Sequence, residues 1–147
     1  MTHAPTILIV EDNDDDFEAC QIALSGDGNL ANPIRRCTTG DDALDYLFCR
    51  GPYAETKPDI PGLILLDLNL PGTDGRSVVT EIKSNHLLRM IPVVVMTSSR
   101  DIRDIQACYS AGANSYVVKP VDLDGFLQAV ARLKEYWFQI ALLPVSR

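Results

Sequence analysis

The sequence has few of the residues that build soft-metal sites or disulfide frameworks. Its 147 residues include two histidines and four cysteines, and no pair of cysteines has the C-x-x-C spacing. Cysteines spread in this way fit neither a zinc site nor a disulfide scaffold. We therefore predict reduced, buried thiols in a cytosolic protein, and solvated surface positions for His3 and His86.

Basic residues and long apolar runs are also scarce. The chain has 13 basic and 20 acidic residues, a formal net charge of −7, which argues against nucleic acid or an anionic membrane surface as a direct partner. No apolar run approaches the roughly 18 residues that a bilayer span needs. The N-terminus lacks the basic and apolar segments of a signal peptide. The sequence thus indicates a cytoplasmic protein.

The main positive feature of the sequence is a set of short apolar runs, each of which ends in polar residues. Five of them are typical of buried strands in a parallel sheet, which is covered on both faces. They lie at 7–10, 33–38, 63–67, 92–96 and 115–118, and amphipathic stretches alternate with them. The alternation predicts a doubly wound α/β fold. We expect a five-stranded parallel sheet in the order 2-1-3-4-5 with helices on both faces.

Local signals predict where several of the helices begin. Residues of capping type precede three of them, at Thr39, Asp101 and Asp122. For the helix after Asp101, the spacing of apolar residues predicts an inner stripe of Ile102, Ile105 and Tyr109. The segment 50–61 contains three prolines and a glycine, and it is a long loop for a connection between a helix and a strand.

Polar side chains follow four of the five strands at the carboxyl ends, which lie along one edge of a parallel sheet. They are Glu11 and Asp12, Asp67, Thr97, and Lys119. Three carboxylates brought together repel one another unless a cation neutralises them. Carboxylate oxygens without His or Cys nearby suit Mg²⁺. Asp67 would then be available as a carboxylate nucleophile in phosphoryl transfer.

Simpler interpretations exist for some of these acids. Asp67, taken alone, would serve equally as a loop cap or as the partner of a nearby lysine. The acids at 14–16 suit the positive end of a helix dipole and need be no more than helix-start residues. Glu11 and Asp12 precede that helix, so the same interpretation does not cover them.

The motifs at these strand ends, taken in order, resemble the receiver domain of two-component response regulators. The resemblance covers about 7–137. The matching residues are Glu11-Asp12, Asp67 within 66–71, Asp74-Gly75, Thr97-Ser98, Tyr116 and Lys119-Pro120.

The resemblance implies that Asp67 is the phosphoacceptor, which takes a phosphoryl group from the histidine of a sensor kinase. It also implies a Mg²⁺ site, for which Mn²⁺ is an alternative ion. Asp12 and Asp67 would bind the ion directly, Glu11 mostly through water, and Asn69 through its backbone carbonyl.

The remaining roles that the resemblance implies concern the phosphoryl group and the switch. Thr97 would move to bond a phosphoryl oxygen, and Tyr116 would turn inward into the space that Thr97 leaves. Tyr116 would otherwise be a plain core aromatic. Lys119 would hold the phosphate, and its bond to Pro120 is expected to be cis.

Finer features resemble the single-domain regulators that are paired with bacterial phytochromes. They are the loop at 50–61, the run at 67–71 and the aromatic segment at 135–138. Similar loops also occur in other stand-alone regulators. We predict one receiver domain over 1–147, with its core at about 7–137 and a C-terminal extension at about 138–147.

The apolar C-terminal segment has two interpretations. It either folds back on the domain or belongs to an exposed apolar interface. We expect a homodimer through the fourth helix, the fifth strand and the fifth helix, in which a twofold axis buries the same face of both chains.

Two other functions compete with the phosphorylation switch. A pseudo-receiver would bind partners without taking phosphate, but the acidic pair, Asp67 and Lys119 are all present. A phosphatase with an aspartyl nucleophile needs a second acid two residues later, where this chain has Asn69. We expect a signalling protein that catalyses only its own phosphotransfer and autodephosphorylation, not an enzyme.

Overall fold

The computed structural model describes residues 4–26, 32–141 and 143–144, apart from the side chains of 139 and 140. In this part of the chain, five strands form one sheet in the order β2-β1-β3-β4-β5, and all neighbouring strands are parallel. The strands are β1 (Ile7–Val10), β2 (Ile34–Cys37), β3 (Leu63–Leu66), β4 (Val93–Thr97) and β5 (Ser115–Val118). The predicted fold class and strand order are confirmed.

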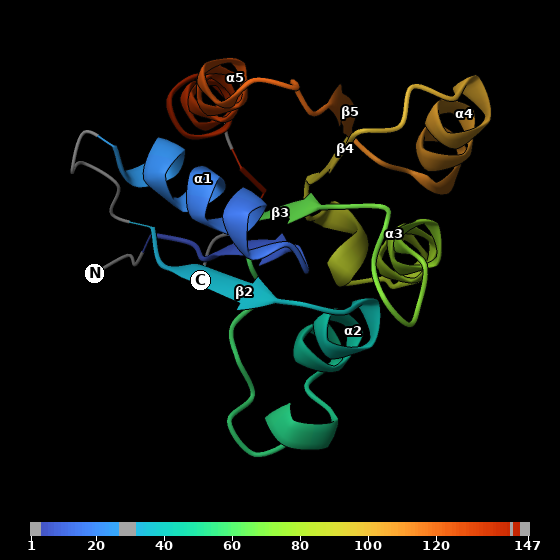
Figure 1. Ribbon diagram of the computed structural model, residues 1–147. Helices are drawn as coiled ribbons and strands as arrows, with labels where there is room; N and C mark the ends of the chain where they lie inside the picture. The colour runs from blue at the N-terminus through green and yellow to red at the C-terminus, as the bar shows by residue number, and fades with distance from the viewer. Residues whose placement is uncertain (1–3, 27–31, 142, 145–147) are drawn as a thin grey trace.

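Helices cover both faces of the sheet (Figure 1). They are α1 (Asp14–Ser25), α2 (Gly40–Phe48), α3 (Gly75–Ser84), α4 (Ile102–Ala111) and α5 (Leu123–Glu135). The helices α1 and α5 pack against one face, and α2, α3 and α4 contribute to the core on the other. Each face has its own apolar core, so the central strands β1, β3 and β4 are buried throughout, as their continuous apolar runs predict.

The predicted helix caps are confirmed. The Thr39 hydroxyl accepts a hydrogen bond from the amide of Asp42 at 3.0 Å. The side chains of Asp101 and Asp122 accept in the same way from Arg103 and Gly125. Each cap satisfies a backbone donor that the first turn of a helix leaves without a partner.

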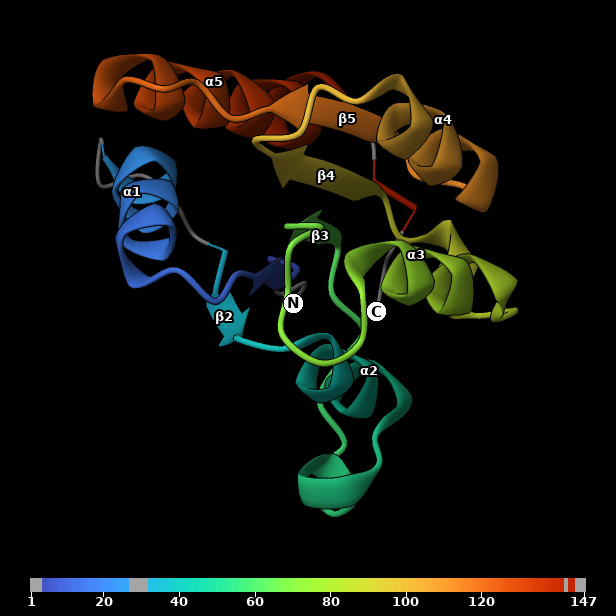
Figure 2. The same cartoon turned by 45° about the vertical axis from the view of Figure 1, so that its right-hand side comes forward.

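The predicted inner face of α4 is wrong at two of its three positions, while the third, Ile105, is half-buried. Ile102 and Tyr109 are 60% and 49% exposed, whereas Cys108 is fully buried. Figure 2 shows the reason, because α4 lies beside β5 at the end of the sheet that is opposite to β2. A helix at the margin of a sheet meets the core along a narrow strip, which here is centred on Cys108, and it leaves apolar side chains in solvent.

The C-terminal segment folds back on the domain. After α5 the chain forms a single π-helical turn, Tyr136–Ile140, from which Trp137 and Phe138 pack against the core between α1, α5 and the sheet. Leu143 reaches Gly62, where an added Cβ would lie 3.3 Å from its Cδ1 atom and 2.5 Å from Cβ of Pro5. Both ends of the described chain therefore lie at the amino-terminal edge of the sheet.

Two short 3-10 turns complete the fold. The loop at 50–61 contains one of them, Gly51–Tyr53, and the connection from α3 to β4 contains the other, Leu88–Met90. Among the described residues, no helix is both long and apolar enough to cross a membrane.

Candidate functional site

Backbone hydrogen bonds fix the strand ends at one edge of the sheet. The amide of Asp67 donates to the carbonyl of Val10 at 3.0 Å, and the amide of Lys119 donates to the carbonyl of Thr97 at 2.8 Å. These bonds continue the ladder one residue beyond the strands, so the side chains that follow are held by the sheet. A site built on such a frame is more precise than one built on a loop alone.

Three carboxylates converge at this edge. Glu11, Asp12 and Asp67 each offer an oxygen, and these oxygens lie within 4.8 Å of one another. Glu11 and Asp67 are buried, with 4% and 8% exposure, while Asp12 is exposed. Hard oxygen ligands with one open side fit a divalent cation that keeps part of its water shell. The predicted acidic cluster is thus assembled by the fold.

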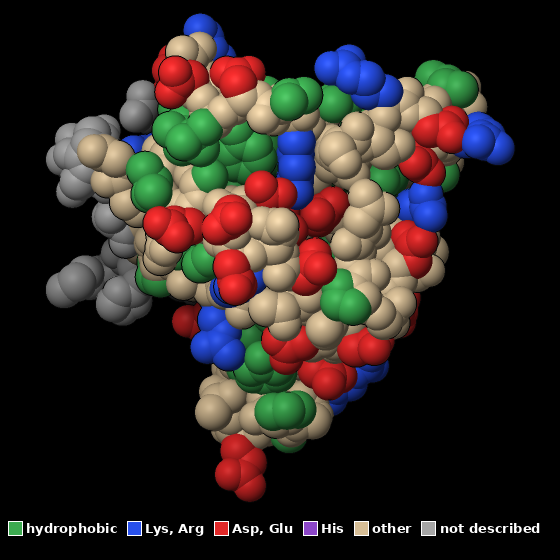
Figure 3. Space-filling view, viewed as in Figure 1, with side chains coloured by type: hydrophobic (Ala, Val, Ile, Leu, Met, Phe, Trp, Pro, Cys, Tyr) green, Lys and Arg blue, Asp and Glu red, His purple; other side chains and the backbone are tan. Residues whose placement is uncertain are grey.

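A cleft of about 400 Å³ opens over these carboxylates. Figure 3 shows acidic side chains gathered on the face of the molecule between α1 and α2. The backbone amide of Asn69 donates to Oδ1 of Asp67 at 3.2 Å, and Asn69 is itself exposed at the cleft. The residues that line the cleft are Asp12, Asn13, Asp16, Asp67, Asn69, Ser98, Lys119, Pro120, Val121 and Phe126.

The first residue of α3 fixes the loop that follows Asp67. A Cβ added at Gly75 would lie 2.7 Å from the carbonyl oxygen of Asp67 and 2.7 Å from Cα of Leu68. Only glycine leaves room for this approach. The helix therefore supports the backbone on which Asp67 sits.

Lys119 is the cation of the site. Its Nζ atom donates to Oε1 of Glu11 at 2.7 Å, to Oδ2 of Asp16 at 2.8 Å and to Oδ2 of Asp67 at 3.1 Å. The Lys119 side chain is 11% exposed. In this largely buried position the ammonium offsets part of the charge of the carboxylates.

The bond between Lys119 and Pro120 is trans, since the described residues contain no cis peptide bond. The cis bond that the resemblance implies is therefore not found. The trans form is the more stable one for X–Pro bonds. With this bond trans, the Lys119 side chain still reaches Glu11, Asp16 and Asp67.

Burial and pairing shift the pKa values of this group in a consistent direction. Burial raises the pKa of Glu11 to about 7, and its hydrogen bond with Lys119 offsets only part of this effect. Burial alone would lower the pKa of Lys119, but hydrogen bonds to Asp16 and Glu11 outweigh it and raise that pKa. Lys119 is therefore charged at neutral pH, and the pKa of Glu11 lies near neutral pH.

Asp16 is the site residue that sequence reasoning missed. The acids at 14–16 were open to interpretation as helix-start residues, and Asn13 does cap α1 by accepting from the amide of Asp16 at 2.9 Å. A signal was present, because Asp16, Cys20 and Leu24 are spaced at i, i+4 and i+8. Cys20 and Leu24 are buried, so the same stripe turns Asp16 toward the sheet.

Thr97 and Tyr116 form a second group beside the carboxylates. Thr97 is fully buried, and its hydroxyl accepts from the amide of Ser99 at 3.4 Å. The Tyr116 hydroxyl donates to the carbonyl oxygen of Ser99 at 3.0 Å. Both predicted switch residues are thus joined to Ser99 rather than to Asp67.

The loop that carries Ser99 is also anchored to α3 and α4. The Ser99 hydroxyl donates to Oδ2 of Asp104 at 2.6 Å, and Asp104 pairs with Arg76. Arg76 in turn pairs with Asp74 at 2.7 Å. This chain of contacts links the loop after β4 to the start of α3, close to the backbone of Asp67.

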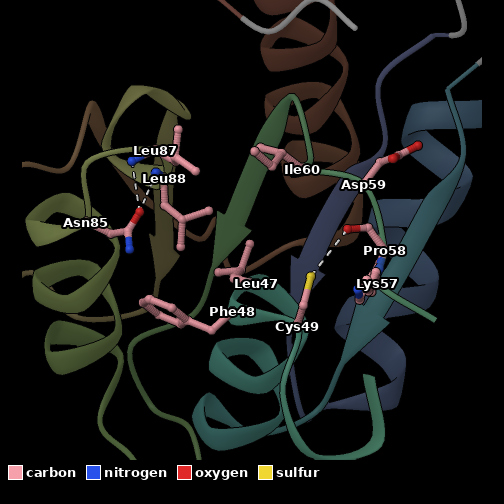
Figure 4. A pocket seen from close by; sticks show the side chains of 10 residues that line it. All are labelled: Leu47, Phe48, Cys49, Lys57, Pro58, Asp59, Ile60, Asn85, Leu87 and Leu88. Carbon is pink, nitrogen blue, oxygen red and sulfur yellow. Dashed lines mark hydrogen bonds between the residues drawn. The ribbon is translucent and has the colours of Figure 1, made fainter. Parts of the chain in front are cut away.

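A second cavity, of about 370 Å³, lies at the opposite end of the strands (Figure 4). Its lining is largely apolar and includes Leu47, Ile60 and Leu88. Two of its polar side chains have internal partners. Asn85 accepts from the amides of Leu87 and Leu88, and Cys49 donates to the carbonyl of Pro58 at 3.7 Å. Reactive groups do not converge among the described residues of this cavity, in contrast to the carboxylate cleft.

Residues 7–131 match the response regulator receiver domain family. The chain belongs to this family. The acidic cluster, Asp67 and Lys119 lie at the strand ends where the sequence motifs predict them, so the resemblance and the geometry agree.

The receiver domain is similar along nearly its whole length to known response regulators. It is 37% identical to the response regulator Rcp1 of Synechocystis sp. over 140 residues, which are 95% of this chain and 93% of Rcp1. A crystal structure of the Mn²⁺-bound form of Rcp1 superposes with a TM-score of 0.90.

Two further solved structures extend this comparison. The phosphorylated cyanobacterial phytochrome response regulator RcpA is 39% identical, with a TM-score of 0.92, and the match covers 97% of this chain and 99% of RcpA. The bacteriophytochrome response regulator AtBRR is 39% identical, with a TM-score of 0.73, and the match covers 95% of this chain and 97% of AtBRR. The receiver domain is thus close to phytochrome-associated regulators, as the loop at 50–61 and the aromatic segment predict.

Proposed function

We propose that this receiver domain accepts a phosphoryl group on Asp67 from the phosphohistidine of a sensor kinase and signals through altered protein–protein contacts. One observation carries the proposal. The Asp67 carboxylate shares a solvent-accessible cleft with a buried ammonium, Lys119 at 3.1 Å, and with two further acids. A loop cap or a simple ion pair needs no such set of groups.

Each residue at this site has a separate role in the phosphoryl transfer. An oxygen of Asp67 attacks phosphorus, the P–N bond to the donor imidazole breaks, and the electron pair of that bond stays with the imidazole nitrogen. Lys119 holds a phosphoryl oxygen as a point charge. Thr97, released from Ser99, supplies a hydroxyl to another oxygen. Most of the catalytic effect comes from positioning and charge stabilisation.

We also propose Mg²⁺ as the ion of this site, with Mn²⁺ as an alternative. The donor set supports a hard divalent cation, which Asp12, Asp67 and the backbone carbonyl of Asn69 would hold, with Glu11 acting mostly through water. When bound, the ion neutralises charge on the phosphoryl group and on the carboxylates. The Mn²⁺-bound structure of Rcp1 is consistent with such a site.

An intact-mass experiment tests the phosphoacceptor. The protein is incubated with Mg²⁺ and acetyl phosphate and compared with Asp67→Asn, and beryllofluoride binding serves as a second reporter. A gain of one phosphoryl group on the wild type alone is the expected result. No adduct and no beryllofluoride binding on the wild type would favour a pseudo-receiver, and steady hydrolysis of many phosphoesters would favour a phosphatase.

We propose a bacteriophytochrome as the partner kinase. The likeness to RcpA and AtBRR over nearly the whole chain supports this choice. Exposed apolar side chains beside the cleft offer a docking surface: Val121 lines the cleft, Leu123 follows it closely in the chain, and they are 104% and 63% exposed. Figure 3 shows apolar side chains gathered over α1 and α5 next to the acidic face.

Phosphotransfer kinetics test the partner. A phosphorylated bacteriophytochrome kinase should transfer faster to this protein than a phosphorylated kinase of unrelated signal specificity. Leu123→Ser, at an exposed position outside the lining of the cleft, should slow that transfer and leave phosphorylation by acetyl phosphate unchanged. Equal rates from both kinases would contradict the choice of partner.

We propose a homodimer through α4, β5 and α5. Its support is the apolar surface that α4 leaves in solvent at Ile102 and Tyr109. Light scattering across a concentration series, with and without beryllofluoride, should detect the dimer, and Ile102→Asp should abolish it. A mass that stays monomeric into the high micromolar range in both states would overturn the proposal.

We propose a cytoplasmic location without direct contacts to nucleic acid or membrane. The four cysteines are free thiols, as expected in a reducing compartment. The net charge of −7 supports neither a phosphate backbone nor an anionic lipid surface as partner.

A further inference from the structure

Lys119 has no donor left for a phosphoryl group in this structure. An ammonium group carries three N–H donors, and its three hydrogen bonds go to Glu11, Asp16 and Asp67 at 2.7, 2.8 and 3.1 Å. A phosphoryl oxygen that binds Lys119 must therefore displace one of these carboxylates. The three partners differ in how firmly they are held.

Glu11 and Asp67 are each held by a second contact. Glu11 is 4% exposed, and its Oε2 atom accepts from the amide of Asn13 at 3.1 Å. Asp67 accepts from the amide of Asn69 at 3.2 Å, and it is the residue that receives the phosphoryl group. Displacing Glu11 would leave the amide of Asn13 without its acceptor. Asp67 must stay in place because it receives the phosphoryl group.

Among the described residues, Lys119 alone holds the carboxylate of Asp16. It lies on the first turn of α1 at the rim of the cleft, with a side chain that is 36% exposed. Its carboxylate has no other hydrogen-bond partner among the described residues. When it turns outward, this carboxylate is hydrated again. Breaking its contact with Lys119 therefore costs less free energy than breaking the contact of a buried acid.

We propose that Asp16 is a positioning residue that occupies Lys119 in the unphosphorylated state and yields it to the incoming phosphoryl group. The inference rests on the proposed phosphorylation of Asp67. Asp16 acts as an internal competitor for one N–H donor. It keeps the Lys119 side chain directed into the cleft, and it raises the donor concentration that is needed to fill the site.

The competition predicts a specific kinetic signature. Asp16→Asn replaces the charged acceptor of Lys119 with a weaker, neutral amide oxygen, so the acetyl phosphate concentration that gives half-maximal phosphorylation rate should fall about three- to tenfold. This range corresponds to the loss of one partly exposed charged contact. The maximal rate should change less than twofold, because the reacting atoms are untouched. The aspartyl phosphate should also persist longer, since the carboxylate of Asp16 no longer competes for Lys119.

Asp15→Asn is the matched control. It removes the same charge from the same helical turn, and Asp15 is exposed and absent from the contacts of Lys119. Its half-saturating concentration should stay within twofold of that of the wild type. Equal shifts in Asp15→Asn and Asp16→Asn would overturn the proposal, because general repulsion of the anionic donor would explain both.

A double-mutant comparison isolates the contact itself. In a Lys119→Met background, Asp16→Asn should produce no further change in the half-saturating concentration, and a change of the wild-type size would also overturn the proposal. Urea unfolding in EDTA gives a metal-free readout. Asp16→Asn should lower the midpoint in the wild type and leave it unchanged in Lys119→Met.

The outcomes separate this inference from the function on which it rests. A wild type that gains no phosphoryl group overturns both. A wild type that is phosphorylated, together with an Asp16→Asn variant that matches it in half-saturating concentration, overturns only the role of Asp16. If Asp16→Asn fails to fold, Asp16→Gln provides the same test with a longer neutral side chain.

Discussion

Tyr116 and Ser99 are joined by a hydrogen bond from the tyrosine hydroxyl to the serine carbonyl oxygen, at 3.0 Å. Ser99 also donates its amide to the Thr97 hydroxyl at 3.4 Å and its own hydroxyl to Asp104 at 2.6 Å. One loop residue therefore touches both predicted switch residues. If Thr97 moves toward a phosphoryl group, as we propose, Ser99 would connect that movement to Tyr116.

Tyr116→Phe should loosen this loop without unfolding the protein. The variant loses one hydrogen bond, worth about 1 kcal/mol, and leaves the half-buried ring in place. We expect faster hydrogen exchange in peptides that contain Ser99, measured by mass spectrometry. Tyr136→Phe, at an exposed ring beside Trp137, is the control. Unchanged exchange at Ser99 would mean that the loop is held by Asp104 alone.

Lys119→Ala should fold and still respond weakly to phosphorylation. The substitution removes the ammonium from three carboxylates, but the apolar cores on both faces of the sheet are untouched. Circular dichroism should show a native spectrum, and acetyl phosphate should induce a smaller change in Tyr116 environment than in the wild type. A variant that is unfolded both with and without Mg²⁺ would show that Lys119 is a structural residue.

The pH dependence of the metal-free protein should report Glu11. Its folded pKa of about 7 exceeds that of an unfolded glutamate, so the folded state binds more protons between these values. This contribution to stability is complete below about pH 4.5 and is lost as pH rises through 7, by roughly 3 kcal/mol. Urea unfolding in EDTA at pH 5.5 and 8 should detect most of this loss, about 2 kcal/mol.

Glu11→Gln is the control for this pH effect, because it cannot titrate and should lack the loss between the two pH values. Metal should bind more tightly at pH 8 than at pH 5.5, since ligands must be deprotonated. Calorimetry in two buffers should detect the released proton. Identical pH profiles for the wild type and Glu11→Gln would contradict the raised pKa.

The four thiols should differ sharply in reactivity. Burial raises the pKa of Cys20 and of Cys37 to about 12, and Cys108 is fully buried. Thiolate is the reactive form, so iodoacetamide should modify only Cys49, which is half-exposed. Peptide mapping identifies the site, and four adducts in guanidinium provide the control. Rapid labelling of Cys20 in the native protein would contradict its burial.

Lys83→Met should destabilise the amino-terminal edge of the sheet. Lys83 donates to the carbonyls of Arg89 and Ile91 and to the Asn114 side chain, at 2.9, 2.7 and 3.0 Å. Methionine keeps the apolar stem but leaves these acceptors without their donor, at a cost of about 1–3 kcal/mol. Thermal unfolding should show the loss. A variant of wild-type stability would mean that water replaces the ammonium.

The sheet and the helix caps were predictable because they depend on local information. The runs at 7–10 and 63–66 are apolar at every position, which suits only a strand buried on both sides, and the cap at Thr39 bonds a residue three positions away. The carboxyl ends of parallel strands meet by geometry. The convergence of Glu11 with Asp67 therefore also followed from the sequence.

The failures all concern contacts that depend on the placement of whole elements. The inner stripe of α4 was wrong because the helix lies at the margin of the sheet, where Ile102 and Tyr109 stay exposed. The contact of Asp16 with Lys119 joins residues 103 positions apart, so its partner cannot be read from helix periodicity. The isomer of the Lys119–Pro120 bond likewise depends on the tertiary setting.

The fold-back of the C-terminal segment has a practical consequence. Pro5 and Leu143 meet at Gly62, so both described ends of the chain lie on the side of the sheet that is opposite to the carboxylate cleft. A fluorophore, affinity handle or sensor-chip linker attached at either end would leave the reactive cleft facing solution. Such a tethered protein could report phosphorylation in real time, since the anchoring point and the chemistry occupy opposite poles of the domain.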